Sequence, residues 1–311
     1  MSIVVGLVIV ALVAAAGWLW TPDEDRSVLE ARYARAPSTF VAAAGLRIHV
    51  RDTGPRGAPA VVLLHGFGSS LHTWEAWAQD LQRDHRVIRL DLPGAGLTGA
   101  DPGGDYSDRR GVEVIAALMD TLDVPRATFV GHSMGGRLAW HLAAALPSRV
   151  ERLVLLAPDG FPIPGTDYAR ASGQPAHVPL VARAMQVVLP RAVLRMNLAP
   201  AFGDRSALTD ALVDRYYDLI RAPTVRSAMV ARLQQAERDD PVPELRRIEA
   251  PTLLVWGAAD AMIPASNATD YLGCLPHARL VVLPGVGHIP QEEVPAESLR
   301  VVREFLDEDR R

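Results

Sequence analysis

The chain has 311 residues, is 49% hydrophobic and carries a formal net charge of −4, which suits one large α/β domain or two small domains. Its positive charges are all arginines and form no basic stripe, so an electrostatic surface for nucleic acid is excluded. Cys274 is the single cysteine, which also excludes an intrachain disulfide and a zinc site of the cysteine type.

The N-terminal residues 1–20 form the first predicted element. Ile3–Trp20 is an uncharged, almost wholly apolar run that as a helix would extend ~27 Å, enough to cross a bilayer core. A signal peptide cleaved near Ala14–Ala16 is the alternative, but no basic residue precedes the run and the apolar residues continue past the alanines. We expect an uncleaved membrane anchor. The sidedness stays open, because arginines and acidic residues both follow the run.

Residues 21–38 are predicted to be a charged connector, and from Thr39 strands and helices alternate. Short apolar runs predict strands over 46–50, 60–64, 87–90, 128–130, 153–156, 252–256 and 280–283. Helical patterns predict helices over 71–83, 107–122, 134–146, 266–275 and 296–307. Such alternation indicates an α/β fold, a mostly parallel sheet with helices on both faces.

One long segment, 161–247, breaks this alternation. It has many prolines, no convincing strand and apolar residues at helical spacing over 178–189 and 208–220. It is much longer than an ordinary connection between a helix and a strand. We therefore predict a helical cap inserted between two parts of the core, 39–160 and 248–311. Its apolar side chains could line a pocket for an acyl chain, or simply form ordinary core.

The strongest chemical signal is Gly131-His132-Ser133-Met134-Gly135, which lies between a predicted strand and a predicted helix. A serine on such a sharp turn is held in a strained conformation with its oxygen pointing out of the sheet. Glycines two residues before and after it let the neighbouring elements pack closely. The pattern predicts that Ser133 is a nucleophile; the alternative is an exposed serine in a tight turn.

Several motifs together resemble the α/β-hydrolase superfamily: Val62-Leu63-Leu64-His65-Gly66-Phe67, Asp91-Leu92-Pro93-Gly94, the Ser133 motif, and Gly287-His288. The likeness runs from about Val41 to the C-terminus. The N-terminal anchor and Leu156-Ala157-Pro158-Asp159-Gly160 resemble, more narrowly, the membrane-attached monoacylglycerol lipase and carboxylesterase branch.

This resemblance implies that a base and an acid follow the nucleophile in the order Ser, Asp, His. His288 comes after the last predicted strand and is the expected base. Asp260 follows the preceding strand and is expected to orient the imidazole, with Asp159 as the alternative acid. Glu292 and Glu293 are expected to form a solvated face or to cap the last helix.

The oxyanion hole of such an enzyme needs two backbone N–H groups. Met134, after the nucleophile, and Phe67, in the loop after the first parallel strand, are the expected donors. His65 is expected to support this loop, and Asp91 to form a turn that braces it. The sequence implies no metal and no organic cofactor.

We expect serine-dependent hydrolysis of carboxylic esters, as in a lipase or serine esterase, through an acyl-enzyme on Ser133. The anchor and the apolar cap favour a lipid-like acyl ester, such as a monoacylglycerol or a medium-chain ester. The alternatives are hydrolysis of a carbon–carbon bond in a ring-fission diketone, because that branch resembles this chain at Ser-Met-Gly-Gly, and a non-catalytic ligand-binding protein. The sequence leaves the oligomeric state open.

Overall fold

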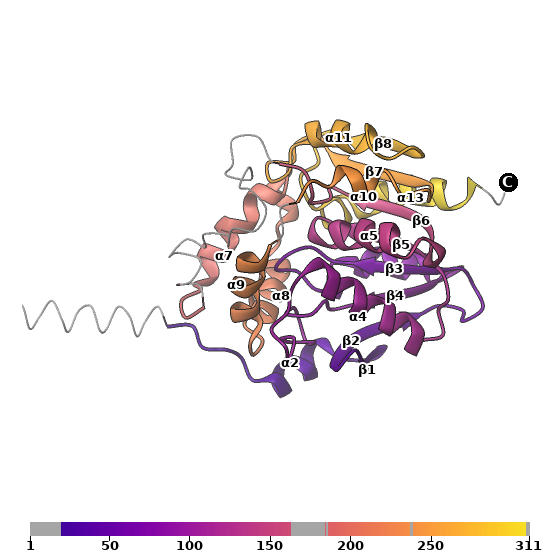
Figure 1. Cartoon of the computed structure of the whole chain (residues 1–311). Helices are drawn as coiled ribbons and strands as arrows, with labels where there is room; N and C mark the ends of the chain where they lie inside the picture. The colour runs from indigo at the N-terminus through magenta and orange to yellow at the C-terminus, as the bar shows by residue number, and fades with distance from the viewer. Residues whose placement is uncertain (1–19, 163–183, 185, 237–238, 309–311) are drawn as a thin grey trace, which may run out of the picture.

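A computed structural model describes residues 20–162, 184, 186–236 and 239–308 and contains an eight-stranded sheet (Figure 1). The strands are β1 (Ser38–Ala43), β2 (Leu46–Thr53), β3 (Ala60–Leu64), β4 (Arg86–Leu90), β5 (Ala127–His132), β6 (Val150–Leu156), β7 (Thr252–Gly257) and β8 (Ala278–Leu283). Their order is β1-β2-β4-β3-β5-β6-β7-β8. Strand β2 pairs antiparallel with β1 and β4, and the other pairs are parallel. The predicted mostly parallel sheet is confirmed.

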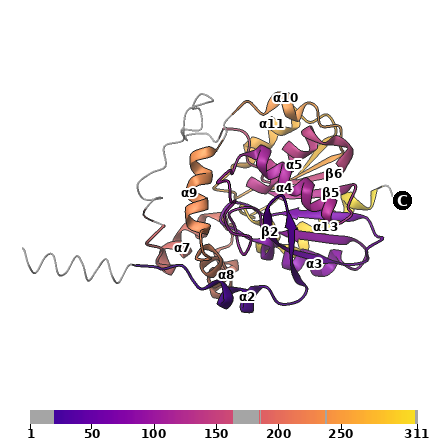
Figure 2. The same ribbon diagram turned by 60° about the horizontal axis from the view of Figure 1, so that its bottom comes forward.

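Helices cover both faces of this sheet (Figures 1 and 2). Along β3, Val61 and Leu63 pack on one face and Val62 and Leu64 on the other, as the two-residue period of a strand requires. The first face is covered by α3 (Glu75–Leu81) and α13 (Pro295–Leu306), and the second by α4 (Asp108–Thr121), α5 (Met134–Ala145) and α11 (Ala268–Leu272). The central strands are therefore buried on both sides, which explains their continuous apolar runs.

Two N-terminal elements differ from the prediction of a connector over 21–38. The segment holds α2 (Arg26–Tyr33), whose N-terminus is capped by the Asp25 carboxylate accepting the N–H of Ser27 at 2.7 Å. Leu29 of this helix is fully buried, so α2 packs on the domain, and β1 already begins at Ser38. The predicted helix over 71–83 is also divided, into the 3-10 turn η1 (Leu71–Trp74) and α3.

The described residues between β6 and β7 contain helices and turns but no strand. They comprise α7 (Arg191–Leu198), η4 (Ala199–Ala201), η5 (Arg205–Ala207), α8 (Asp210–Ile220), α9 (Val225–Gln235) and α10 (Val242–Leu245). Three short elements lie outside this segment: η2 (Pro147–Arg149), η6 (Ala265–Asn267) and α12 (Pro290–Glu293). The helices α7, α8 and α9 lie together at one end of the sheet (Figure 1). The predicted helix over 208–220 corresponds to α8, whereas most of 178–189 lies outside the described residues.

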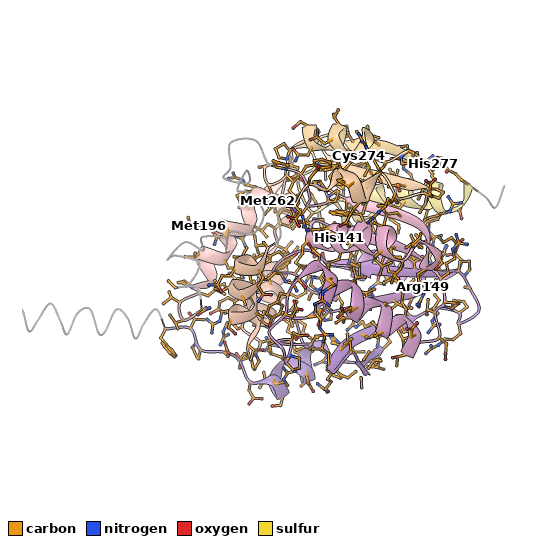
Figure 3. The ribbon with its side chains drawn as sticks, in the orientation of Figure 1. His141, Arg149, Met196, Met262, Cys274 and His277 are labelled. Atoms are coloured by element: carbon orange, nitrogen blue, oxygen red, sulfur yellow. The ribbon has the colours of Figure 1, made fainter. Side chains whose placement is uncertain are left out.

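Residues 21–24 run along this helical segment. Thr21 donates its N–H to Val187 O at 2.9 Å, and its hydroxyl accepts the N–H of Leu189 at 3.1 Å. Met196 of α7 points outward and is 72% exposed (Figure 3). The expected anchor, 1–20, lies outside the described residues except for Trp20. Within the described part of the chain, no helix is both long and apolar enough to span a bilayer.

Candidate active site

The sharp turn between β5 and α5 places Ser133 at the carboxyl edge of the sheet. Its backbone has φ 53° and ψ −119°, a conformation that costs a non-glycine residue about 1–3 kcal/mol. The turn is anchored by Ser133 N–H donating to Leu156 O at 2.9 Å, and by Ser133 O accepting the N–H of Asp159 at 3.1 Å. The neighbouring strand thus holds the strained residue in place, as the sequence motif predicts for a nucleophile.

Close backbone packing around this turn explains its glycines. A Cβ on Gly131 would lie 2.3 Å from Gly135 O, and a Cβ on Gly135 would lie 2.3 Å from Leu64 O. Both obstacles are main-chain atoms, which cannot rotate away as a flexible side chain would. The positions therefore have room for hydrogen only, and the helix α5 starts directly against β3 and β5.

Gly131→Ala is expected to lower the free energy of unfolding by about 3 kcal/mol, because a methyl group would overlap backbone atoms. Urea unfolding followed by circular dichroism measures this change. Gly57→Ala is the matched control, since a Cβ at Gly57 meets no atom within 4 Å, and its stability is expected to stay within about 0.5 kcal/mol of the wild type. Equal stability of the two variants would contradict the packing argument.

His288 and Asp260 form a buried pair at the same edge of the sheet. The distance from His288 Nδ1 to Asp260 Oδ2 is 2.7 Å. The other oxygen of Asp260 accepts the N–H groups of Met262 at 2.8 Å and Ile263 at 2.9 Å. Because a carboxylate only accepts, Nδ1 is the protonated nitrogen of a neutral His288, which leaves Nε2 as an acceptor. This is the tautomer that a general base at Nε2 requires.

The imidazole of His288 lies next to the turn that carries Ser133. Its ring centroid is 4.7 Å from that of His132, and His132 Nε2 donates to His288 O at 2.8 Å. In the described part of the chain no hydrogen bond joins Ser133 Oγ to His288. Such bonds are often long before substrate binds, so the arrangement is compatible with a base that serves Ser133.

The residues of both expected oxyanion donors lie close to Ser133. Met134 is the first residue of α5, and Phe67 follows Gly66, whose added Cβ would lie 3.3 Å from Ser133 Cβ. Phe67, Ser133 and Met134 line one common cavity. The N-terminus of α5 also adds a partial positive charge beside Ser133. The site could therefore stabilise an oxyanion that develops next to this serine.

Asp159, the alternative acid, lies elsewhere in the site. It follows β6 and lines the cavity beside Ser133. The carboxylate within hydrogen-bond distance of His288 Nδ1 belongs to Asp260. The structure thus places the two candidates differently, one on the imidazole and one on the cavity wall.

Glu293 is half-buried and ties the loop of His288 to the cap, a contact that the prediction of a solvated face did not include. Its carboxylate accepts three backbone N–H groups: Gly287 at 2.8 Å, Asp204 at 2.7 Å and Gly203 at 3.2 Å. His288 N–H in turn donates to Ala201 O at 2.7 Å. The position of His288 is therefore linked to the backbone of the segment 201–204.

The side chain of Glu292 is buried, against the prediction of a solvated face. It accepts from Arg215 Nη2 at 2.8 Å and contacts the hydroxyl of Tyr216, both on α8. Burial raises the pKa of Glu292, and the nearby guanidinium of Arg215 opposes that rise. This ion pair joins α12, directly after His288, to the cap.

The cavity above Ser133 has a volume of about 230 Å³, and its accessible lining is more apolar than polar, although several charged residues contribute to its wall. Its lining residues are Phe67, Tyr106, Asp108, Ser133, Met134, Arg137, Asp159, Arg232, Leu233, Gln235 and Ala236. A smaller, apolar cavity of about 70 Å³ shares Phe67 and Leu233 with it and is lined by Leu189, Ile220, Arg226, Met229 and Val230 as well. Leu189 belongs to the apolar cap stretch expected to line a pocket.

Two arginines in the wall of the larger cavity have different hydrogen-bond partners. Arg137 Nε donates to Asp108 Oδ2 at 2.6 Å. Burial would raise the pKa of Asp108, but His141 and Arg137 lower it to about 2. Arg232 donates to the carbonyl oxygens of Pro93 at 2.7 Å and Tyr106 at 3.3 Å, and burial lowers its pKa. The cavity wall thus carries fixed charges of both signs.

Sequence reasoning did not identify Arg232, Arg215 or the roles of Glu292 and Glu293. The two arginines lie on cap helices, and nothing local distinguishes them from other arginines of the segment. The adjacent glutamates do follow His288 closely, which is a weak signal that they contact its loop. The described residues contain no cluster of three or more His, Cys, Asp or Glu side chains arranged to hold a metal ion.

Comparisons with known proteins agree with this architecture. The family model described as alpha/beta hydrolase fold matches residues 59–295. The dihydrolipoyllysine-residue acetyltransferase component of the acetoin cleaving system of Pseudomonas putida is 32% identical over 82% of this chain, which spans 65% of that relative's length. The 2-hydroxy-6-oxo-2,4-heptadienoate hydrolase of Pseudomonas putida is 30% identical, covering 86% of this chain and 95% of that protein.

Two solved structures are similar over most of their length. The meta-cleavage product hydrolase CumD of Pseudomonas fluorescens IP01 is 27% identical with a TM-score of 0.75, covering 87% of this chain and 98% of that chain. A membrane phospholipase A, described as a bacterial virulence factor, is 27% identical with a TM-score of 0.73, covering 98% of each chain. These matches do not confirm the narrower resemblance to monoacylglycerol lipases. With a family model that matches 59–295, the chain belongs to the alpha/beta hydrolase fold family and is a hydrolase of that fold.

Proposed function

We propose that this hydrolase uses Ser133 as its nucleophile, His288 as its general base and Asp260 to orient the imidazole. The observation that carries the proposal is the His288–Asp260 pair, which lies beside a strained turn that exposes Ser133 to a cavity. Ser133 Oγ would add to a carbonyl carbon while His288 Nε2 takes its proton. The N–H groups of Phe67 and Met134 would stabilise the oxyanion.

For the bond that is cleaved, we propose first a carbon–carbon bond next to a ketone in a vinylogous diketone. The support is twofold: the similar proteins named above include hydrolases of this kind, and the cavity beside Ser133 is small, about 230 Å³, with charged groups in its wall. A small cavity with charged groups suits a compact substrate with oxygen functions better than a long acyl chain. The ester reading is therefore the second candidate.

The reaction balances without a cofactor. The dienol would first take its diketone form, as its hydroxyl proton moves to the carbon next to the ketone. Collapse of the tetrahedral adduct would then break the bond between the acyl carbon and that neighbouring carbon, and the electron pair would move into the conjugated second carbonyl as a dienolate. The proton held by His288 would then go to this dienolate. Water, deprotonated by His288, would hydrolyse the acyl-enzyme and release a carboxylic acid.

The second candidate is hydrolysis of a lipid-like ester. One specific observation favours it: the similar membrane phospholipase A covers 98% of this chain. The small apolar cavity next to Phe67 could receive part of an acyl group. This candidate includes membrane attachment through residues 1–20, and the leaving group would be an alcohol.

A substrate panel separates the two candidates. The full chain is assayed with 2-hydroxy-6-oxo-2,4-heptadienoate, with p-nitrophenyl esters of increasing chain length, and with monoacylglycerol and phospholipid vesicles. We expect kcat/KM for the diketone to exceed that for every ester by at least about 100-fold, which corresponds to about 2.7 kcal/mol of transition-state stabilisation. A higher kcat/KM for any ester would instead establish the second candidate.

A further inference from the structure

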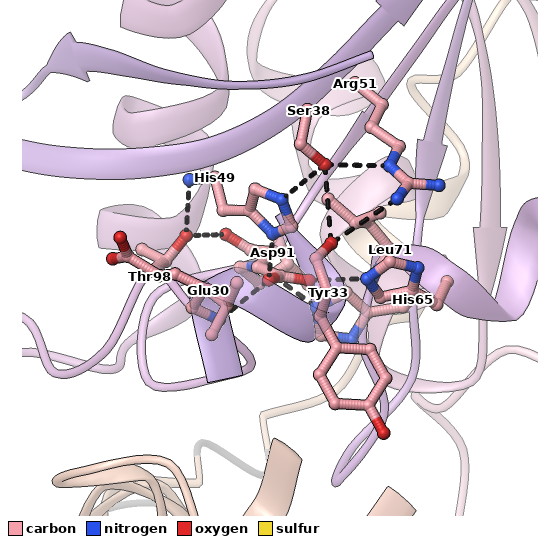
Figure 4. A network of polar contacts seen from close by, with 12 residues as sticks. Glu30, Tyr33, Ser38, His49, Arg51, His65, Leu71, Asp91 and Thr98 are labelled. Atoms are coloured by element: carbon pink, nitrogen blue, oxygen red, sulfur yellow. Dashed lines mark hydrogen bonds and ion pairs between the residues drawn. The ribbon is translucent and has the colours of Figure 1, made fainter. Parts of the chain in front are cut away.

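A row of hydrogen-bonded side chains connects β1 to the loop that carries Phe67 (Figure 4). Ser38 begins β1, His49 lies in β2, and Asp91 directly follows β4. His49 Nε2 is 2.9 Å from Ser38 Oγ, and His49 Nδ1 is 2.8 Å from Asp91 Oδ2. The side chains of His49 and Asp91 are fully buried. The chemistry described so far uses neither of them.

One arrangement of protons satisfies the whole row. The Asp91 carboxylate only accepts, so a neutral His49 carries its proton on Nδ1 and Nε2 accepts from the Ser38 hydroxyl, whose other acceptor, Tyr33 O, is farther away at 3.5 Å. Arg51 Nε donates to Ser38 Oγ at 2.9 Å. The connectivity is that of a serine–histidine–aspartate relay, but the hydroxyl oxygen of Ser38 is already engaged by this guanidinium. We therefore treat the row as structural and not as a second nucleophile.

Asp91 also binds the oxyanion loop, which we define as Gly66–Leu71. Asp91 Oδ1 accepts the N–H of Leu71 at 2.7 Å, at the end of the loop. At its start, His65 Nε2 accepts the N–H of Leu92 at 3.0 Å and His65 Nδ1 donates to Gly66 O at 2.8 Å. Both ends of the loop are thus attached to Asp91–Leu92, and the expected bracing by Asp91 is observed.

Asp91 is a buried charged group and therefore needs its hydrogen-bond donors. Burial alone would raise the pKa of Asp91, but His49, His65 and His72 lower it to about 2, so the group is a carboxylate at neutral pH. A buried carboxylate that loses a donor must find another or draw in water. The other donors to Asp91 are the N–H groups of Leu71 and Leu97, in the loops that Asp91 holds.

We propose that His49 is a positioning residue for the oxyanion hole: held between Ser38 and Asp91, it fixes the carboxylate that sets the backbone of the oxyanion loop. The inference rests on the proposed role of Phe67 N–H as an oxyanion donor. His49 touches no substrate. It acts through Asp91 and Leu71, and its loss moves a donor whose position matters most when negative charge develops on the substrate.

Two substitutions of His49 separate its two nitrogens. The amide nitrogen of asparagine lies as far along the side chain as Nδ1, whereas that of glutamine lies as far as Nε2. His49→Asn therefore keeps a donor for Asp91, and His49→Gln keeps only a partner for Ser38. Ser38→Ala removes the outer link and leaves the Nδ1–H donor in place.

We expect His49→Gln to lower kcat by about tenfold or more with KM within about twofold of the wild type, since loss of a complete oxyanion donor costs about 10²–10³ in kcat. Affinity for a trifluoromethyl ketone, which forms a tetrahedral oxyanion, is expected to fall in parallel. His49→Asn is expected to keep both kcat and ketone affinity within about threefold of the wild type. Ser38→Ala is expected to lose less kcat and less ketone affinity than His49→Gln. A purely structural role would lower stability without this parallel loss.

The proposal is overturned if folded His49→Gln keeps kcat and ketone affinity within twofold of the wild type, or if His49→Asn loses as much as His49→Gln. Should His49→Gln not fold, Leu71→Pro tests the same link from the loop. Ser70 is already extended, with φ −152° and ψ 174°, as the residue before a proline usually is, and Leu71 is the first residue of η1, where proline is tolerated. The substitution removes the N–H that Asp91 accepts. Its kcat is expressed per site that reacts with a fluorophosphonate, and an unchanged kcat overturns the proposal.

The two proposals fail in different ways. If Ser133→Ala removes turnover while His49→Gln has no effect, only the positioning role fails. If Ser133→Ala keeps full turnover, the proposed nucleophile fails, and the positioning role fails with it because no oxyanion would form beside Phe67.

Discussion

Ser133→Ala is expected to lower kcat by about 10⁴- to 10⁶-fold on every substrate that the wild type turns over. The alanine keeps the packing of the turn but removes the oxygen that would form the acyl-enzyme. The remaining rate would come from binding and from the oxyanion donors alone. Substrate depletion in the purified variant measures the loss, and labelling by a fluorophosphonate probe is expected to disappear with it.

Ser206→Ala serves as the control for this result, because Ser206 is an exposed serine in a turn capped by Asp204. Its kcat and labelling are expected to equal those of the wild type. Retention of substantial turnover by Ser133→Ala would remove the nucleophile from the proposal and favour a different chemistry on this fold.

Asp260→Asn is expected to lower kcat by about 10³- to 10⁴-fold, while Asp159→Asn is expected to lower it less than about tenfold. Asp260 accepts from His288 Nδ1 and is itself held by two N–H groups. An asparagine there can offer an N–H to Nδ1 and so favour the tautomer that is protonated on Nε2, which cannot act as the base. Asp159 lines the cavity wall, where its loss would alter substrate binding and hence KM.

Steady-state kinetics of both variants on one substrate decide between the two carboxylates. The expected pattern is a fall in kcat for Asp260→Asn and a change mainly in KM for Asp159→Asn. A larger fall in kcat for Asp159→Asn than for Asp260→Asn would make Asp159 the functional acid, despite the hydrogen bond observed between Asp260 and His288. Circular dichroism of both variants checks that each remains folded.

The loop after β8 contains one predicted contact and several contacts that were not predicted. The resemblance to the α/β-hydrolase superfamily, with its order Ser, Asp, His, predicted that His288 and Asp260 would meet, and parallel strands do bring their carboxyl ends to one edge of the sheet. The partners of Glu292 and Glu293 could not be predicted in this way. Their contacts are with Arg215 and with the N–H groups of Gly203 and Asp204 in the cap, and they depend on how the cap rests on the core.

The N-terminal connector also has contacts with the cap that the sequence did not predict. Charged residues over 21–38 indicated a connector, yet α2 forms there, with Leu29 buried and Tyr33 donating to Asp218 of α8 at 2.7 Å. An eight-residue helix is marginal alone, so packing decides whether it exists. Local composition could not reveal that its partner lies nearly two hundred residues away.

By itself the sequence determined the alternation of strands and helices, the mostly parallel sheet and the turn that carries Ser133. Each of these depends on residues close together in the chain: apolar periodicity, or glycines two positions from a serine. Only the tertiary structure decided which charged groups line the cavity, and that His49 reaches the oxyanion loop through Asp91. These features join residues from separate elements, and such contacts follow from the packing of the whole domain, which no local pattern encodes.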